Sequence, residues 1–186
     1  MKAWQHFKTI TRHRALVRKN CFRVGLYWQG LTHDLSKFTP TEFKVGAKYF
    51  QGTRSPNGAE RQEIGWSTAW IHHKGRNRHH FEYWNDLDLT TKRYESVPMP
   101  RKYVAESIMD RIAACRVYEG DGYTDASALN YLDRSLDGQL MHPATYREMR
   151  FLLTMLKDKG ETETFYYIKN HFLQGKPFPW EENTEE

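Results

Sequence analysis

Apolar residues recur at steps of three and four positions along most of this chain, a spacing that favours helices over strands. The first segment illustrates it, with Ile10, Val17 and Val24 on one stripe and His13 on the same face. No stretch alternates apolar and polar residues with a period of two, so no strand is expected. The sequence therefore predicts an all-α fold, a bundle of about seven to eight helices.

The helical segments follow one another closely enough to form one domain. They are expected at residues 4–24, 26–38, 40–50, 59–74, 101–118, 126–136, 143–159 and 161–173. Thr39, Pro40 and Glu42 have the spacing of a capping box that starts the third of them. We therefore predict a single helical domain over residues 1–180, followed by an acidic, flexible tail at residues 181–186.

Two of these segments place polar residues beside apolar ones. In the fourth segment, Ile64, Trp66 and Trp70 are expected in the core, and His73 falls on the face of the two tryptophans. In the fifth segment, Asp110 lies next to the apolar stripe, on a face that also carries small residues. A carboxylate beside small residues leaves room for a bound group.

The composition limits the class of protein. Aromatic residues make up 15% of the chain, as expected for a packed globular body. The formal charge of +5 suits a small anionic substrate, and we do not expect nucleic acid as a partner. No apolar run is long enough for a membrane span or a signal peptide. Cys21 and Cys115 lack the CxxC spacing and are expected to be reduced thiols, so we predict a cytoplasmic protein without a membrane contact.

Most of the histidines fall into one pattern with two aspartates. In order these are His13, His33-Asp34, His72-His73, His79-His80 and Asp110. Imidazole nitrogen and carboxylate oxygen are ligands for divalent metals, and residues far apart in sequence can converge inside a helical bundle. Neighbouring side chains on a helix point about 100° apart, so one histidine of each pair is expected to face inward, with His73 and His80 preferred and His79 next.

Each histidine or His-Asp pair alone is a weak signal for a metal site, so the prediction rests on their occurrence together in one chain. The predicted metal ligands are His13, His33, Asp34, His73, His79, His80 and Asp110. We expect one or two divalent ions there, and the pattern does not distinguish Mn, Fe, Zn and Ni.

The order H…HD…D resembles that of the HD superfamily of metal-dependent phosphohydrolases. The resemblance implies an HD-like helical bundle in which these residues are the metal ligands. The segment His33-Asp34-Leu35-Ser36-Lys37, followed by Pro40, resembles the HDxGKxxxP segment of the HD-GYP branch, with Ser36 in place of the glycine. The Gly-Tyr-Pro that names that branch is absent from the sequence, so its substrate is not carried over.

Three longer segments resemble those of the DUF5662 family. They are LTHDLSKFTPTEF at residues 31–43, AWIHHKGRNRHHFEYW at residues 69–84 and MDRIAAC at residues 109–115. The resemblance spans roughly Thr11 to Tyr131. It implies an HD-like fold, and it carries no established reaction.

The function expected from this pattern is that of a phosphohydrolase acting on a small phosphorylated metabolite or nucleotide through a metal-activated water. Asp34 is expected to bridge two metals or orient the water, and Lys37 to offer its charge to the phosphate. Lys37 is equally compatible with a solvated surface position. Arg76, Asn77 and Arg78 are candidates for a phosphate clamp, or else an exposed basic loop.

Two other functions fit the same residues. An HD-type di-iron oxygenase would use the additional histidines beside the HD pair. A helical nucleic-acid-binding module with a structural metal would use the basic loops, although no basic-aromatic binding motif is present.

Overall fold

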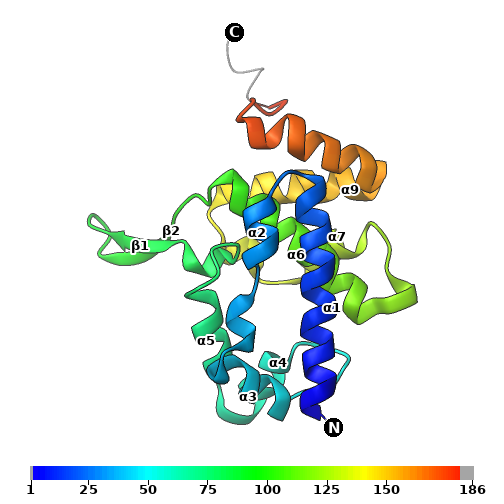
Figure 1. Cartoon of the computed structure of the whole chain (residues 1–186). Helices are drawn as coiled ribbons and strands as arrows, with labels where there is room; N and C mark the ends of the chain where they lie inside the picture. Colours follow the sequence, from blue (N-terminus) through cyan, green and yellow to red (C-terminus); the bar gives the residue numbers. More distant parts are fainter. Residues whose placement is uncertain (1, 181–186) are drawn as a thin grey trace.

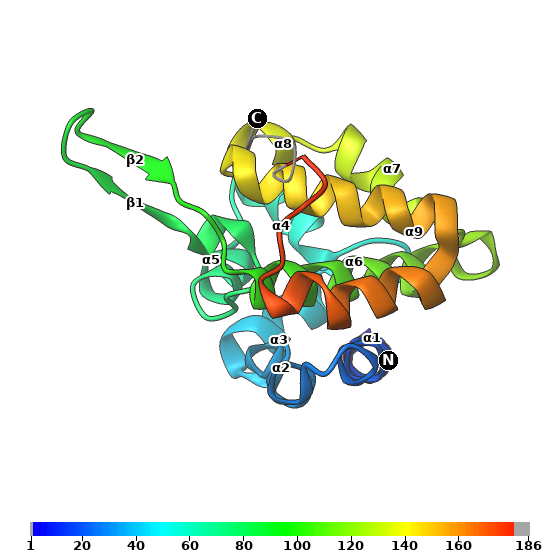
Figure 2. The same cartoon turned by 90° about the horizontal axis from the view of Figure 1, so that it is seen from above.

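Three long helices form the centre of the fold in this computed structural model, which describes residues 2–180. Helix α6 (Arg101–Glu119) packs between α1 (Lys2–Arg23) and α9 (Pro143–Asn170), as Figures 1 and 2 show. The apolar stripes read from the sequence supply the shared core, with Val17, Ile108 and Leu152 fully buried. Removing these side chains from water is the main stabilisation of such a bundle.

Shorter elements surround these helices and complete a mostly helical single domain, which confirms the predicted fold class. The other helices are α2 (Tyr27–Thr32), α3 (Pro40–Lys48), α4 (Pro56–Ile64), α5 (Thr68–Lys74), α7 (Ser127–Arg134) and α8 (Asp137–Leu140). Short 3-10 turns occur at η1 (Leu35–Phe38), η2 (Phe81–Tyr83), η3 (Gly120–Gly122) and η4 (Phe172–Gln174). Helices α3, α4 and α5 lie at one end of α1, away from α9 (Figure 1). The predicted tail at residues 181–186 lies outside the described residues.

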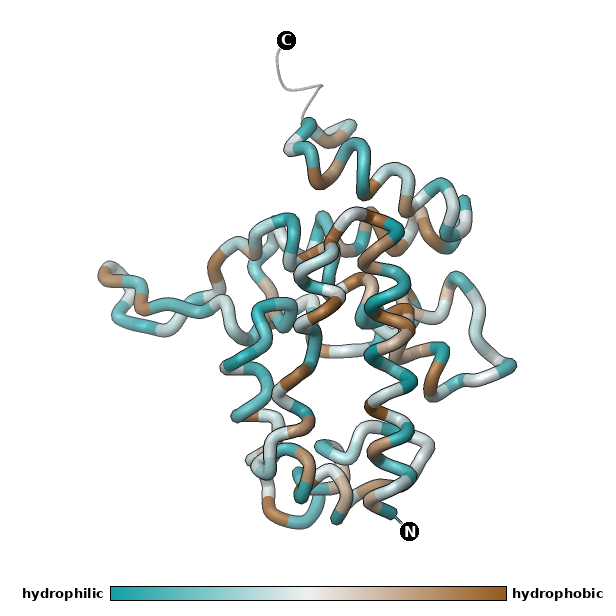
Figure 3. The backbone as a smooth tube through the Cα atoms, viewed as in Figure 1, coloured by the Kyte–Doolittle hydropathy of each residue, from teal (hydrophilic) through white to brown (hydrophobic). Residues whose placement is uncertain are grey.

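A small antiparallel hairpin is the one departure from the predicted all-helical content within the described residues. Strands β1 (Asn85–Asp88) and β2 (Arg93–Ser96) pair with Leu87 opposite Tyr94 and project away from the helices (Figure 2). Both strands are exposed along most of their length, so neither face required an apolar pattern. The hydropathy colouring in Figure 3 shows apolar positions toward the outer end of this hairpin.

The predicted helix at residues 59–74 is wrong, because the structure divides it into α4 and α5. Gly65 adopts a left-handed conformation (φ 87°) that ends α4, and the Ser67 hydroxyl accepts a hydrogen bond from Trp70 N at the start of α5. The break turns Ile64 and Trp66 outward, and Trp66 is 57% exposed. Neither residue belongs to the core as predicted.

The break predicted at Gly160 is present as a kink within α9, which comprises two helical halves on either side of this residue. Gly160 has φ 76° and ψ 176°, which are not helical values and favour glycine. The two halves of α9 therefore change direction at this residue, and the second half continues toward η4. No helix among residues 2–180 combines the length and the apolar character that crossing a membrane requires.

Candidate metal centre

A backbone break brings the adjacent residues His33 and Asp34 to one point. The predicted helix over residues 26–38 is interrupted there, because His33 has extended torsions and Asp34 is left-handed (φ 53°). Aspartate tolerates this conformation better than most residues. In a continuous helix the two side chains would diverge by about 100°. The break instead allows both to be buried and to face the same centre.

Helix α1 stabilises this break and contributes a ligand. Arg14 donates hydrogen bonds from Nε to His33 O (2.7 Å) and from its guanidinium to Leu31 O (3.2 Å). These carbonyls are left without helical partners where α2 ends. One position earlier on the same helix, His13 is buried and faces α6.

The first group of possible ligands joins α1, the break and α6. His13 Nε2 lies 2.9 Å from Asp110 Oδ1 and 3.8 Å from Asp34 Oδ2. His33 Nε2 lies 3.4 Å from Asp34 Oδ2 and 3.5 Å from Asp110 Oδ1. One donor atom from each of these four residues lies within 4.8 Å of the others, so together they could hold one metal ion. We refer to them as the His13 group.

The second group joins the break to α5 and the turn that follows it. His73 Nε2 lies 3.2 Å from Asp34 Oδ1, and His79 Nε2 lies 3.5 Å from the same oxygen. With His80, these residues form a second set of four whose donor atoms lie within 4.8 Å of one another. We refer to it as the His80 group. Asp34 belongs to both groups, with one carboxylate oxygen toward each.

The ring nitrogens that face the centre form no hydrogen bonds of acceptable geometry. Buried Nε2 atoms without a hydrogen-bond partner occur in His13, His33, His73, His79 and His80. A buried polar atom left unpaired costs about 1–3 kcal/mol, so five of them around one point indicate a missing partner that they share. Nitrogen and carboxylate donors without a thiolate suit a borderline or hard divalent cation. The residues present therefore fit a metal.

Two carboxylates behind the rings orient them. His33 Nδ1 donates a hydrogen bond to Glu106 Oε1 (3.0 Å), and His79 Nδ1 lies 3.1 Å from the same oxygen. A proton on Nδ1 leaves the lone pair on Nε2, where a metal would bind. Glu106 was not predicted from the sequence. Its position one helical turn before Asp110 places both carboxylates on one face of α6, and this spacing was a usable signal.

Glu42 has the same role for α5. His72 Nδ1 and His73 Nδ1 donate to its two carboxylate oxygens, each at 2.7 Å. The predicted capping box is therefore wrong, because Glu42 points to α5 and no side-chain cap forms at Thr39. His72 is held by Glu42 outside both groups.

The charges around the centre favour cations. Burial alone would raise the pKa values of Asp34 and Asp110, but the neighbouring histidines hold both well below the ordinary value, so both are carboxylates. Burial would likewise lower the pKa of His33, but the Asp34 carboxylate, with Asp110 and Glu106, raises it to about 10. Burial keeps the pKa of His80 well below its ordinary value, so this imidazole is neutral.

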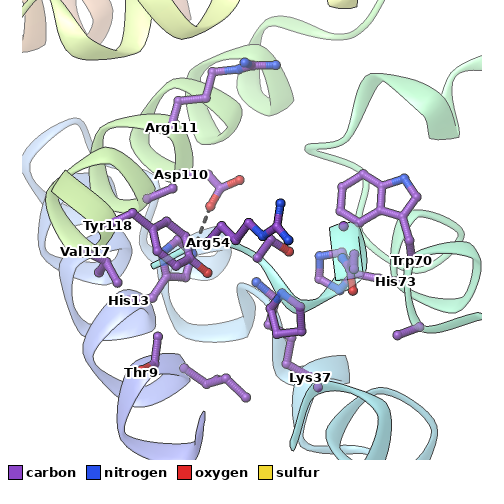
Figure 4. A pocket seen from close by; sticks show the side chains of 18 of the residues that line it. Thr9, His13, Lys37, Arg54, Trp70, His73, Asp110, Arg111, Val117 and Tyr118 are labelled. Carbon is purple, nitrogen blue, oxygen red and sulfur yellow. Dashed lines mark ion pairs between the residues drawn. The ribbon is translucent and has the colours of Figure 1, made fainter. Parts of the chain in front are cut away.

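A cavity of about 580 Å³ opens onto the centre. Its wall includes His13, His73 and Asp110, so both groups can be reached from it (Figure 4). Lys37 also lines the cavity, and its Nζ lies 2.6 Å from Asp34 Oδ2. The volume is in the range of small-molecule sites.

The predicted phosphate clamp is not assembled at this cavity. Arg76 and Arg78 are exposed, and neither lines the cavity. Arg76 donates to His72 O, and Arg78 donates to the Tyr103 hydroxyl. Asn77 is buried and donates from Nδ2 to Ser36 Oγ (2.9 Å) and His73 O (2.8 Å). These bonds tie the turn after α5 to the HD segment, so Asn77 has a positioning role that the sequence did not indicate.

One of three comparisons with known proteins places the chain in a family. A family model described as "Family of unknown function (DUF5662)" matches residues 2–155. No curated protein and no solved structure is significantly similar to the chain.

Proposed function

The chain belongs to the DUF5662 family, whose description assigns no function, and from the geometry of its metal centre we propose a metal-dependent hydrolase of phosphate esters. The observation that carries the proposal is the shared carboxylate of Asp34. It joins the His13 and His80 groups, whose ring nitrogens lack hydrogen bonds and adjoin a cavity. The order of these residues along the chain, which resembles that of the HD superfamily, supports the same proposal.

We propose that the four residues of each group would hold one divalent ion, and that the Asp34 carboxylate would contribute to both positions. Bound ions would acidify a water molecule and polarise a phosphoryl oxygen. Four carboxylates, from Asp34, Asp110, Glu42 and Glu106, lie at or directly behind the ligand atoms, and Lys37 pairs with one of them. With the imidazoles neutral, as metal ligands must be, these groups leave a surplus of negative charge that two divalent ions would reverse. A reversed charge attracts an anionic substrate.

Lys37 is the chain's own cation at the reacting group. It reaches the cavity from η1 and is oriented by its ion pair with Asp34. In the proposed reaction, water adds to phosphorus, the bond from phosphorus to the leaving oxygen breaks, and the products are an alcohol and phosphate. Lys37 would stabilise the negative charge on the phosphoryl oxygens, which grows as the bond to the leaving group breaks.

Elemental analysis of the purified protein tests the proposal first. The wild type is compared with His33→Ala and with a matched control, His142→Asn. His142 lies outside both groups and caps α9, a position that asparagine suits. We expect one to two ions of Mn, Fe, Zn or Ni per chain in the wild type and the control, and loss of metal in His33→Ala with the fold retained by circular dichroism.

Release of phosphate from a panel of phosphate esters then tests the reaction with each metal-loaded form. A wild type that stays metal-free after reconstitution with each ion would overturn the proposal. Stoichiometric iron with oxygen consumption and no phosphate release would favour an oxygenase instead. Comparing the rates of phosphate release between metals and between esters then gives the preferred metal and the preferred leaving group.

A further inference from the structure

Four lysine and arginine side chains line the cavity that opens onto the metal centre, and in the described part of the chain only two of them pair with carboxylates. Two of its cations have carboxylate partners: Lys37 with Asp34 (2.6 Å) and Arg111 with Asp137 (2.6 Å). The other two are Arg54 and Arg61, and no carboxylate within residues 2–180 lies in ion-pair distance of either guanidinium. The cavity therefore offers two cations that are free to bind an anion.

The partners that these two arginines do have are neutral. Arg54 donates to the side-chain oxygens of Gln51 (2.7 Å) and Gln62 (3.1 Å). The guanidinium of Arg61 lies over the ring of Trp70, with 5.6 Å between its carbon and the ring centroid. Amide and aromatic contacts orient a guanidinium without cancelling its charge. Both exposed side chains are thus oriented by these contacts and keep their charge available to an anion.

The carboxylates that line the same cavity are engaged elsewhere. Glu42 accepts from two histidines, Asp110 faces the ring nitrogens of the metal centre, and Glu119 accepts from the Ser127 hydroxyl. Burial raises the pKa of Glu82, which favours its neutral form. None of them compensates Arg54 or Arg61.

Trp70 relates the position of Arg61 to the metal centre. Its ring centroid lies 4.7 Å from that of His80 and 5.5 Å from that of His73, and Arg61 packs on the same indole. One indole ring therefore contacts both the Arg61 guanidinium and two of the candidate ligand imidazoles. Arg54 and Trp70 are both among the labelled side chains around the cavity in Figure 4. An anion at these arginines would sit beside the centre and would not occupy it.

We propose that Arg54 and Arg61 form a second anion subsite, and that the substrate carries a phosphate or carboxylate group besides the phosphate ester that is hydrolysed. The inference rests on the proposed hydrolase function. A guanidinium binds either anion through paired N–H groups, so the two chemistries share one recognition element. Because the Arg61 guanidinium lies 5.6 Å from the Trp70 ring centroid, and the ring centroid of His80 lies 4.7 Å from the same point, we expect a spacer of several atoms between the two anionic groups.

Binding of three non-hydrolysable probes to the metal-loaded protein tests this inference. Propylphosphonate carries one anionic group, whereas 4-phosphonobutyrate adds a carboxylate and propane-1,3-bisphosphonate adds a second phosphonate at the end of the same three-carbon spacer. Affinities are measured by isothermal titration for the wild type, for the double variant Arg54→Gln/Arg61→Gln and for Arg147→Gln. Arg147 is an exposed arginine on α9 that does not line the cavity, so it is the matched control.

We expect at least one probe with a second anionic group to bind the wild type and the control about tenfold more tightly than propylphosphonate. In the double variant this advantage should fall below about threefold, with the metal content and the affinity for propylphosphonate unchanged. The more tightly bound of the two probes identifies the second group as carboxylate or phosphate.

Equal affinity of the wild type for all three probes, or an advantage that persists in the double variant, would overturn the subsite and leave the hydrolase proposal standing. A wild type that holds no metal and binds none of the probes would overturn the proposed function, and the subsite with it.

Discussion

His33 and His79 share one oxygen atom: Glu106 Oε1 lies 3.0 Å from His33 Nδ1 and 3.1 Å from His79 Nδ1. His33 belongs to the His13 group and His79 to the His80 group. A single buried carboxylate thus directs the lone pair of one imidazole in each group toward the centre. Within the proposed two-ion site, Glu106 couples the geometry of both positions although it binds neither ion through this oxygen.

Replacing Glu106 with glutamine tests that coupling. The amide keeps the size of the side chain but removes the negative charge that favours a proton on each Nδ1. We expect Glu106→Gln to lower the affinity for metal by about 10- to 100-fold with little change in the fold. Competition with a chromogenic chelator measures the affinity, and Glu163→Gln, an exposed position on α9, is the control. Equal affinities in both variants would show that Glu106 does not orient the ligands.

The shared carboxylate of Asp34 predicts an unequal effect of single substitutions on the number of bound ions. Asp34→Asn should weaken both positions, because an amide has one oxygen and no charge to share. His13→Ala should affect only the His13 group, and His80→Ala only the His80 group. From two ions per chain in the wild type, we expect about one in either histidine variant and fewer than one in Asp34→Asn. A histidine variant that loses both ions, or an Asp34→Asn protein that keeps both, would contradict a bridged pair.

Periodicity predicted the helices that bury a face, because burial imposes an apolar stripe with the helical repeat. It recovered α1, α6 and both halves of α9, and it placed His13 on the inner face. It missed the β1–β2 hairpin, whose strands are mostly exposed and carry no such constraint. The predicted helix at residues 59–74 also continued through Gly65. Glycine is a common residue just after a helix end, and serine is a common N-cap, so Gly65 and Ser67 together could have indicated the break.

The buried cluster of possible metal ligands was predictable in its residue types and less so in its geometry. A histidine that follows a helical face, such as His73, could be oriented from the sequence. The left-handed backbone of Asp34 could not, since this conformation depends on the surrounding structure, including the hydrogen bond from Arg14 to His33 O. Arg54 and Arg61 were not predicted as binding residues, because residues 51–61 contain no recognisable motif. Arg76, which was predicted from its place between the histidine pairs, does not line the cavity.

Metal binding should release protons. The Asp34 carboxylate outweighs the effect of burial and raises the pKa values of both His33, to about 10, and His73. At neutral pH the His33 imidazole is therefore protonated in the metal-free protein, and the pKa of His73 is shifted in the same direction, whereas a metal binds only the neutral ring. The apparent affinity for metal should rise with pH across the neutral range. Titration calorimetry in two buffers of different ionisation enthalpy should give one to two protons released per chain, and fewer for His33→Ala. Heats that do not depend on the buffer would contradict the assignment.

His6 should make the metal-free protein less stable in mild acid. Its ring is buried against Phe43 and Phe50, and burial, with the charge of Lys37, lowers its pKa from 6.5 to about 4. Because the unfolded state takes up the proton more readily, the stability present above pH 6.5 is lost as the pH falls toward 4. The loss is at most about 3 kcal/mol in the free energy of unfolding. Urea unfolding, with chelator present, measures the free energy of unfolding of the wild type and of His6→Phe. As the pH falls from 6.5 to 4, we expect this free energy to fall more in the wild type than in the variant. A difference that stays constant from pH 7.5 to pH 4 would show that His6 takes up its proton equally well in the folded protein.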